Sequence, residues 1–271
     1  MIFHQIKSIL IKDFLIEYSY KGRFIYSILF IFMQLVIFYF LSSYLEASYT
    51  RNEDSPTTNL FGFFILGICF LDISYTLISY VSIRIEEYKK IGVFEELFIL
   101  PVNPITFILM SNIYPIFFSL FKFFVYIAFV SILFNIQIHG FINLFILILV
   151  LLFALITFMA LSLLASSFAI LYYRGSYISM VHNTISVLFG GVLYPASFIY
   201  EKLFFLELFI PLHSILDLVR YAFDVHDMSR FDIMQNIFLV IIHSIVFSLI
   251  GTISVKYALR KAFDEGRISL Y

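Results

Sequence analysis

The sequence has few of the groups on which soluble proteins depend. Charged residues make up 13% of its 271 residues, whereas a soluble domain carries about 25%. Trp is absent, and the single cysteine, Cys69, excludes an internal disulfide and a metal site built on several thiolates. By contrast, 62% of the residues are hydrophobic, and the mean hydropathy is +1.00. This composition predicts an integral membrane protein.

The signatures of several enzyme classes are missing as well. The chain has no phosphate loop of the G-x-x-x-x-G-K-[ST] type, so it is not expected to bind and hydrolyse ATP in the usual way. It also lacks H-E-x-x-H and G-x-S-x-G. Neither Glu86-Glu87 nor Glu95-Glu96 is followed by an arginine at the spacing used by one class of membrane peptidases. We therefore expect no catalytic residue and no metal site in this chain.

Six apolar stretches are candidates for crossing a bilayer, which takes about 20 residues of helix. The predicted fold is all-α, with one transmembrane domain over residues 1–271. Residues 1–22 alternate apolar and polar side chains at helical spacing, which predicts a helix lying in the membrane interface. The first 23 residues show no compact apolar core with a small-residue cleavage site, so we expect no cleavable signal. The predicted spans are 24–45, 60–83, 105–134, 141–171, 179–194 and 233–255.

The distribution of positive charge predicts the orientation. With six spans, both termini lie on the same side of the membrane. Twelve of the 17 Lys and Arg residues lie on that side, in the two tails, in residues 84–104 and in the loop before the fifth span; four lie on the other side. Lys and Arg concentrate on the cytoplasmic side of membrane proteins. We therefore expect both termini and residues 84–104 to be cytoplasmic.

The longest polar interruption in the first half is residues 84–104, which read RIEEYKKIGVFEELFILPVNP. Two acidic pairs and one basic pair surround Gly92, and an apolar run follows before Pro101. The order predicts a short amphipathic helix on the membrane surface, with its acidic pairs toward water or toward a basic groove of a partner. A solvated loop whose charges only set the topology is the simpler alternative.

A second unusual stretch lies between the fifth and sixth spans. Pro195 is expected to end the fifth span, because proline donates no backbone N–H and clashes with the preceding turn. Backbone freed at membrane depth has to be buried in protein or line water. We therefore predict a re-entrant helical hairpin over residues 195–232, with Pro211 opening its second helix. Asp217 and Arg220 share a face of that helix and can pair.

Asp72 and Lys122 are the two charged residues inside predicted spans. Such residues are costly in a bilayer and usually face a cavity or a partner. Counted from the predicted cytoplasmic ends of their spans, Asp72 lies about 16 Å deep and Lys122 about 26 Å. A direct pair then requires the two spans to shift relative to each other. Lys122 can instead extend outward to the interface.

Together, the two unusual stretches resemble the permease subunit of type-2 ABC exporters (ABC-2 permeases). That family carries a cytoplasmic segment after its second span, matched here from Glu86-Glu87 to Pro101-Val102. Val93 stands where threonine is usual, and Ile199-Tyr200 stand where a second proline is common, which leaves the subfamily open. The family also carries a glycine–proline segment ending its fifth span and a P-L-x-x-x-x-D/A-x-x-R segment before its sixth. The residues of this second signature are Gly190, Gly191, Tyr194, Pro195, Pro211, Leu212, Asp217 and Arg220.

The resemblance implies a transport subunit of an inner-membrane exporter, working as a dimer with a separate ABC ATPase that binds ATP and Mg²⁺. It implies no cofactor on this chain, and we expect no nucleic-acid partner. The substrate would be a hydrophobic, lipid-linked or glycan-linked molecule, or a drug. The segment 84–104 would include the coupling helix that docks on the ATPase. Its candidate contact residues are Glu86, Glu87, Gly92, Glu95, Glu96, Leu97 and Pro101.

Two alternatives belong to other classes. A stand-alone secondary transporter driven by an ion gradient would use Asp72 as its proton or sodium site. A membrane enzyme is the weaker alternative, because the motifs above are missing. The presence of a partner ATPase separates the first alternative from an ABC permease.

Overall fold

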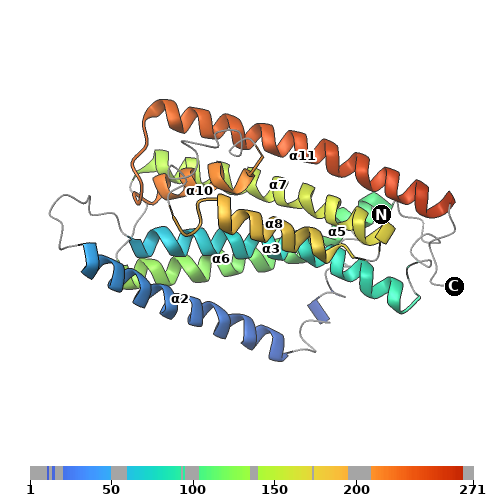
Figure 1. Cartoon of the computed structure of the whole chain (residues 1–271), viewed down its shortest axis with the longest axis horizontal. Coiled ribbons are helices and arrows are strands. Elements are labelled where there is room, and N and C mark those ends of the chain that lie inside the picture. Colours follow the sequence, from blue (N-terminus) through green and yellow to red (C-terminus); the bar gives the residue numbers. More distant parts are fainter. Residues whose placement is uncertain are drawn as a thin grey trace.

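The computed structural model describes residues 11, 14–15, 21–49, 60–92, 94, 104–134, 140–172, 174–194 and 209–264. Every regular element within these residues is an α-helix, which confirms the predicted all-α class. The interfacial helix predicted over residues 1–22 lies largely outside them. The helices are α2 (Lys21–Tyr49), α3 (Leu60–Lys90), α5 (Pro104–Ser111), α6 (Ile113–Phe134), α7 (Phe141–Tyr172), α8 (Ser176–Phe189), α10 (Pro211–Ala222) and α11 (Arg230–Asp264) (Figure 1).

Five stretches of helix are long and apolar enough to cross a membrane, and they correspond to five of the six predicted spans: Ile25–Leu45, Leu60–Lys90, Ile105–Ile132, Phe141–Tyr172 and Arg230–Asp264. The predicted fifth span is different. Its helix, α8, has 14 residues, a length of roughly 21 Å, whereas the hydrocarbon core of a bilayer measures about 30 Å. The described residues therefore hold five helical stretches of spanning length, and the helix of the predicted fifth span is too short to be a sixth.

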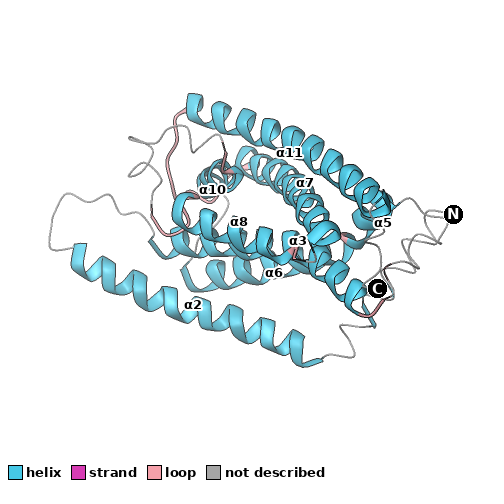
Figure 2. Cartoon of the chain, turned by 45° about the vertical axis from the view of Figure 1, so that its right-hand side comes forward, coloured by secondary structure: helices cyan, strands magenta, loops and turns pink. Residues whose placement is uncertain are grey.

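The long helices lie side by side, with α2 at one edge of the bundle and α11 at the other (Figures 1 and 2). α7 lies inside and packs against α3, α8, α10 and α11. Close packing of α7 on α11 needs small residues: a Cβ on Gly251 of α11 would lie 2.5 Å from the carbonyl oxygen of Ala160 on α7. In contrast, Ile31, Leu35 and Ser42 are the buried side chains among those described in α2.

The third predicted span, 105–134, is divided in two. α5 ends at Ser111 and α6 begins at Ile113, with Asn112 between them. Pro115 lies in the first turn of α6, where the absence of an N–H is tolerated. The Asn112 side-chain amide donates to the carbonyl oxygen of Ile108 at 3.0 Å, and the backbone carbonyl oxygen of Asn112 accepts from the backbone N–H of Ile116 at 3.1 Å. The helix is thus interrupted a few residues before Pro115, whereas the sequence predicted one continuous helix here.

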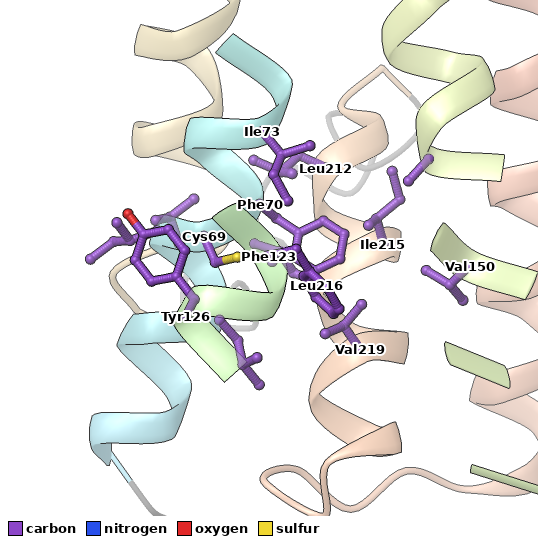
Figure 3. Close-up of a cluster of buried hydrophobic side chains, with 14 of the residues drawn as sticks. Cys69, Phe70, Ile73, Phe123, Tyr126, Val150, Leu212, Ile215, Leu216 and Val219 are labelled. Atoms are coloured by element: carbon purple, nitrogen blue, oxygen red, sulfur yellow. The ribbon is translucent and has the colours of Figure 1, made fainter. Parts of the chain in front are cut away.

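The main apolar core lies where α3, α6, α7 and α10 meet. Figure 3 shows Phe70 of α3 and Phe123 of α6 side by side, with Leu216 and Val219 of α10 next to them. The two rings pack edge to face with their centroids 5.9 Å apart, a favoured geometry for aromatic pairs. Burial of α10 is almost complete: every residue from Pro211 to Arg220 except Asp217 is buried. The short helix is therefore a core element.

Candidate functional site

The first part of the segment 84–104 is a continuation of α3. The helix runs on to Lys90, so the predicted boundary at residue 83 is wrong by two turns. The amphipathic periodicity of residues 84–90 belongs to the end of a spanning helix. Gly92 then takes a left-handed conformation (φ 75°), which only glycine adopts readily, and Phe94 returns into a core formed by α3, α5, α7 and α11. Glu95, Glu96, Leu97 and Pro101 lie outside the described residues.

Two side chains of the α3 terminus hold the turn that joins α7 to α8. Glu86 accepts a hydrogen bond from the backbone N–H of Ser176, the first residue of α8, at 2.9 Å. Lys89, three residues on, donates to the carbonyl oxygen of Ile170 in the last turn of α7. A carboxylate at a helix N-terminus and an ammonium at a helix C-terminus both complement the helix dipoles. We call Glu86, Lys89, Ile170 and Ser176 the α3 clamp.

Lys89 is buried, with 2% of its surface exposed, and its ammonium group also lies 5.2 Å from the centre of the Phe94 ring. A buried ammonium needs such partners, because an unpaired one is costly. Arg84 and Glu87 form an ion pair of 3.1 Å on another face of α3, with Glu87 about half exposed. Of the two acidic residues in this part of the segment, Glu86 thus holds α8, while Glu87 faces outward.

The glycine pair ends α8. Gly190 is the C-cap of the helix, and Gly191 follows with φ 70°. We predicted that Pro195 ends this span; the helix instead stops five residues earlier, because left-handed glycines are strong helix terminators. Pro195 lies outside the described residues, and Tyr194 is half-buried. Val192, just after the glycines, is fully buried against α3.

Arg220 of α10 holds this turn to α3. Its guanidinium lies 3.4 Å from the centre of the Phe63 ring, and its Nη2 donates to the carbonyl oxygens of Phe63 at 3.1 Å and of Val192 at 3.3 Å. The residue is 1% exposed. Gly67 makes room for the contact: a Cβ there would lie 2.6 Å from the Val192 oxygen. The turn that follows Gly190-Gly191 and the arginine of the second signature, Arg220, therefore contact each other and both pack on α3.

Pro211 opens α10 as predicted, with Ile210 as N-cap. The predicted pairing of Asp217 with Arg220 is wrong. Asp217 lies 3.5 Å from His213, one turn earlier on its own helix, while Arg220 turns to carbonyl oxygens and an aromatic face. Three residues of separation place two side chains near each other on a helix, but the carbonyl oxygens of Phe63 in α3 and of Val192 after α8 offer Arg220 two acceptors.

Asp72 of α3 and Lys122 of α6 form a direct ion pair. The Lys122 ammonium donates to Asp72 Oδ2 at 2.9 Å and to Thr76 Oγ1 at 3.1 Å, and it lies 5.0 Å from the centre of the Phe118 ring. The shift that the depth count required is unnecessary, because the count for Asp72 began too early. α3 extends to Lys90, which lies 18 residues beyond Asp72, or about 27 Å, and this depth matches the one counted for Lys122.

A cavity of about 550 Å³ opens beside this pair. On α3, residues that line the cavity recur every three or four positions from Ile68 to Glu87, over a length of about 28 Å. α2 forms the opposite wall, and α6 and α8 contribute Lys122 and Asn183. Tyr126 of α6 donates its hydroxyl to Gln34 of α2, which closes the far side. We call this space the α2–α3 cavity. Among the described residues, no three His, Cys, Asp or Glu side chains are arranged to hold a metal ion.

Comparisons with known proteins agree with this architecture. The fold and the candidate site define a multi-pass helical membrane protein without a nucleotide-binding domain in the described residues. The chain matches the family model of the ABC-2 type transporter over residues 4–223, and therefore belongs to that family. No curated protein matches the sequence. The chain is thus a membrane-spanning permease subunit of the ABC transporter class, as the resemblance in its sequence predicted, and the family generally works with an ABC ATPase.

Several residues of the site could not be found from the sequence. Gly67 and Phe63 lie in an unbroken apolar run, and only the position of Arg220 reveals their role. Gln34 is the one amide in a predicted span near the N-terminus, and its polarity was a usable signal. Ser176 contributes its backbone N–H, which no side-chain pattern announces.

Proposed function

We propose that this chain is the transmembrane half of an ATP-driven exporter, working as a dimer in the inner membrane with both termini cytoplasmic. A separate ATPase subunit binds ATP and Mg²⁺ and docks on the segment that follows α3. The cargo is a hydrophobic, lipid-linked or glycan-linked molecule, or a drug. Membership of the ABC-2 type transporter family supports the class of machine, and the six-span layout with α8 and α10 as the re-entrant region is part of the proposal.

The α3 clamp is the observation that carries the docking site. Glu86 and Lys89 tie the end of α3 to the end of α7 and the start of α8. The end of α3 at Lys90 therefore lies beside the end of α7 and the start of α8. A push on the segment that follows α3 moves α3, and it reaches α7 and α8 through two charge-assisted bonds, which are stronger than neutral hydrogen bonds. Such a junction suits the transmission of an ATPase movement into the membrane.

The ion-gradient alternative is less well supported. A proton or sodium site at Asp72 needs a carboxylate that exchanges its partner during transport. In this structure Lys122 is the counter-ion of Asp72, and its ammonium also donates to Thr76. The absence of a phosphate loop in the sequence then assigns ATP hydrolysis to another subunit.

The test uses the full chain, affinity-tagged and purified from its own membranes. We expect an ATPase with a phosphate loop to co-purify with it. Changing Glu95→Lys together with Glu96→Lys should abolish that co-purification and the stimulation of ATP hydrolysis by substrate. Glu53→Lys with Asp54→Lys is the matched control, because it reverses an acidic pair in the loop predicted on the opposite side.

Two outcomes contradict the proposal. One is a wild-type preparation without any ATPase whose transport follows a proton or sodium gradient and disappears in Asp72→Asn. The other is an unchanged ATPase complex and unchanged coupled hydrolysis after the reversal at residues 95 and 96, which removes the docking role from this segment.

A further inference from the structure

The α2–α3 cavity has an unusual charge balance for a space inside a membrane protein. Four of its lining residues are ionised, and they form two closed pairs, Asp72 with Lys122 and Arg84 with Glu87. The formal charge of the wall is therefore zero. The volume of about 550 Å³ falls within the range of small-molecule sites, about 300–1,000 Å³.

The two members of the Asp72–Lys122 pair differ in how much of their hydrogen-bonding capacity is used. Lys122 has three N–H donors, and its ammonium contacts Asp72 Oδ2, Thr76 Oγ1 and the face of Phe118. Little capacity is left for an anion. Asp72 uses Oδ2 for the lysine, and within the described residues its second oxygen, Oδ1, accepts no hydrogen bond. The Asp72 side chain keeps 15% of its surface exposed. The unused bonding position of the pair is thus an acceptor, which suits a hydrogen-bond donor on a ligand.

The remaining polar groups of the wall are uncharged. Along the cavity, hydroxyl and amide groups alternate with apolar side chains: Ser27, Gln34, Thr76, Ser79 and Asn183 with Phe30, Ile68, Leu71 and Ile83. Tyrosines at 26, 75 and 80 add rings that carry hydroxyl groups. This mixture matches a molecule with an apolar chain and hydroxyl groups at one end. A net charge on the ligand would leave water for a partly apolar space that offers no unpaired counter-charge, which is costly.

We propose that the α2–α3 cavity binds the uncharged, hydroxyl-bearing headgroup of an amphipathic molecule, and that the Asp72–Lys122 pair selects against cargo of net charge. A headgroup hydroxyl donates to Asp72 Oδ1. This inference rests on the proposed transport function and names the chemistry of its cargo. It also gives the ion pair a role in specificity, because a closed pair offers no unpaired counter-charge to either an anion or a cation.

The experiment measures headgroup preference with three probes that share a dodecyl chain: dodecyl maltoside, dodecyl phosphate and dodecyltrimethylammonium. The full chain is placed in phosphatidylcholine nanodiscs, and each probe competes with a photoactivatable dodecyl maltoside whose cross-links are mapped. We expect cross-links on α2, α3 and α6, and the maltoside to bind about tenfold more tightly than either charged probe, equivalent to about 1.4 kcal/mol.

Single variants should move the preference in opposite directions. Asp72→Asn leaves Lys122 unpaired, so dodecyl phosphate should bind about tenfold more tightly than to the wild type. Lys122→Gln leaves Asp72 unpaired, so dodecyltrimethylammonium should gain by a similar factor. Lys256→Gln and Asp227→Asn, exposed charges outside the cavity, are the matched controls and should change neither. A merely structural pair would weaken all three probes together.

The proposal can be tested even if the single variants fail to fold. If the single variants do not fold, the reversed pair, Asp72→Lys with Lys122→Asp, keeps the charge balance and should keep the maltoside preference. The wild-type preference is decisive by itself: equal or tighter binding of a charged probe, or cross-links away from these helices, overturns the inference. ATPase co-purification reports on the transport function separately, because Asp72 and its partner Lys122 lie about five turns of α3 away from Lys90, after which the docking segment begins.

Discussion

Replacing Gly67 by alanine tests how α3, the end of α8 and α10 are joined. A Cβ at position 67 would lie 2.6 Å from the carbonyl oxygen of Val192 and 3.1 Å from Nη2 of Arg220. The first distance is well inside van der Waals contact, and the atom that it meets belongs to backbone. The turn after α8 therefore has to move away from α3, and the Arg220–Val192 hydrogen bond of 3.3 Å has to lengthen or break.

The size of the effect follows from two opposing terms. Overpacking a tight core costs about 1–3 kcal/mol. Alanine gains up to about 1 kcal/mol over glycine in a helix, which offsets part of that cost. Gly22→Ala is the matched control, because it makes the same change in α2, where a Cβ meets nothing within 4 Å. Because Gly22 is the second residue of α2 and gains less from alanine than a residue inside a helix, the two variants should differ by somewhat less than the overpacking cost of about 1–3 kcal/mol.

Thermal unfolding of the purified chain in one detergent measures the difference. At roughly 2–4 °C per kcal/mol for a chain of this size, Gly67→Ala should unfold roughly 2–12 °C below Gly22→Ala. Equal midpoints for the two variants would refute the close approach of Val192 to α3. A larger replacement, Gly67→Val, should widen the gap further, because its added methyl groups point into the same space.

Two further predictions concern the charged groups. Arg220→Lys loses the planar group that stacks on Phe63 and bridges two carbonyls, so the stability measured by thermal unfolding should fall by about 1.5–3 kcal/mol. The control, Arg230→Lys, changes an exposed residue and should be neutral. Equal effects of the two changes would contradict the stacked geometry. Glu86→Ala removes the acceptor for the first N–H of α8 and should speed amide hydrogen exchange in a peptide covering residues 174–180, at a cost of about 0.5–2 kcal/mol. Glu87→Ala is its control, and an unchanged rate in Glu86→Ala would exclude the cap.

The sequence was informative wherever a residue's chemistry is local. Apolar runs of sufficient length predicted five helices that have spanning length, and Pro211 predicted the start of α10 to the residue. Proline and glycine act through their own backbone, so their effects need no knowledge of neighbours. Even here the two compete: Gly190 and Gly191 end α8 before Pro195 is reached, and a rule for proline alone places the end too late.

Tertiary partners could not be predicted from spacing along one helix. Asp217 and Arg220 are three residues apart, yet each contacts another partner: Arg220 bonds the carbonyl oxygens of Phe63 and Val192, and Asp217 lies beside His213. The Asp72–Lys122 pair was one of two options, and counting depth from assumed helix ends pointed away from it. The Glu86–Ser176 contact joins residues 90 positions apart, and a single sequence holds no local sign of it.

The contacts of Arg220 hold some helices together more firmly than others. A buried guanidinium that leaves its carbonyl acceptors is left without water, which is costly, so separating α10 from α3 is unfavourable. The end of α8 is included in the same contact, since Val192 supplies one acceptor. These three elements behave as a fixed frame. α2 has three buried residues among its described side chains, and one described hydrogen bond, from Tyr126 to Gln34, joins it to α6. We therefore expect the cavity to widen by movement of α2, with the opposite wall stationary.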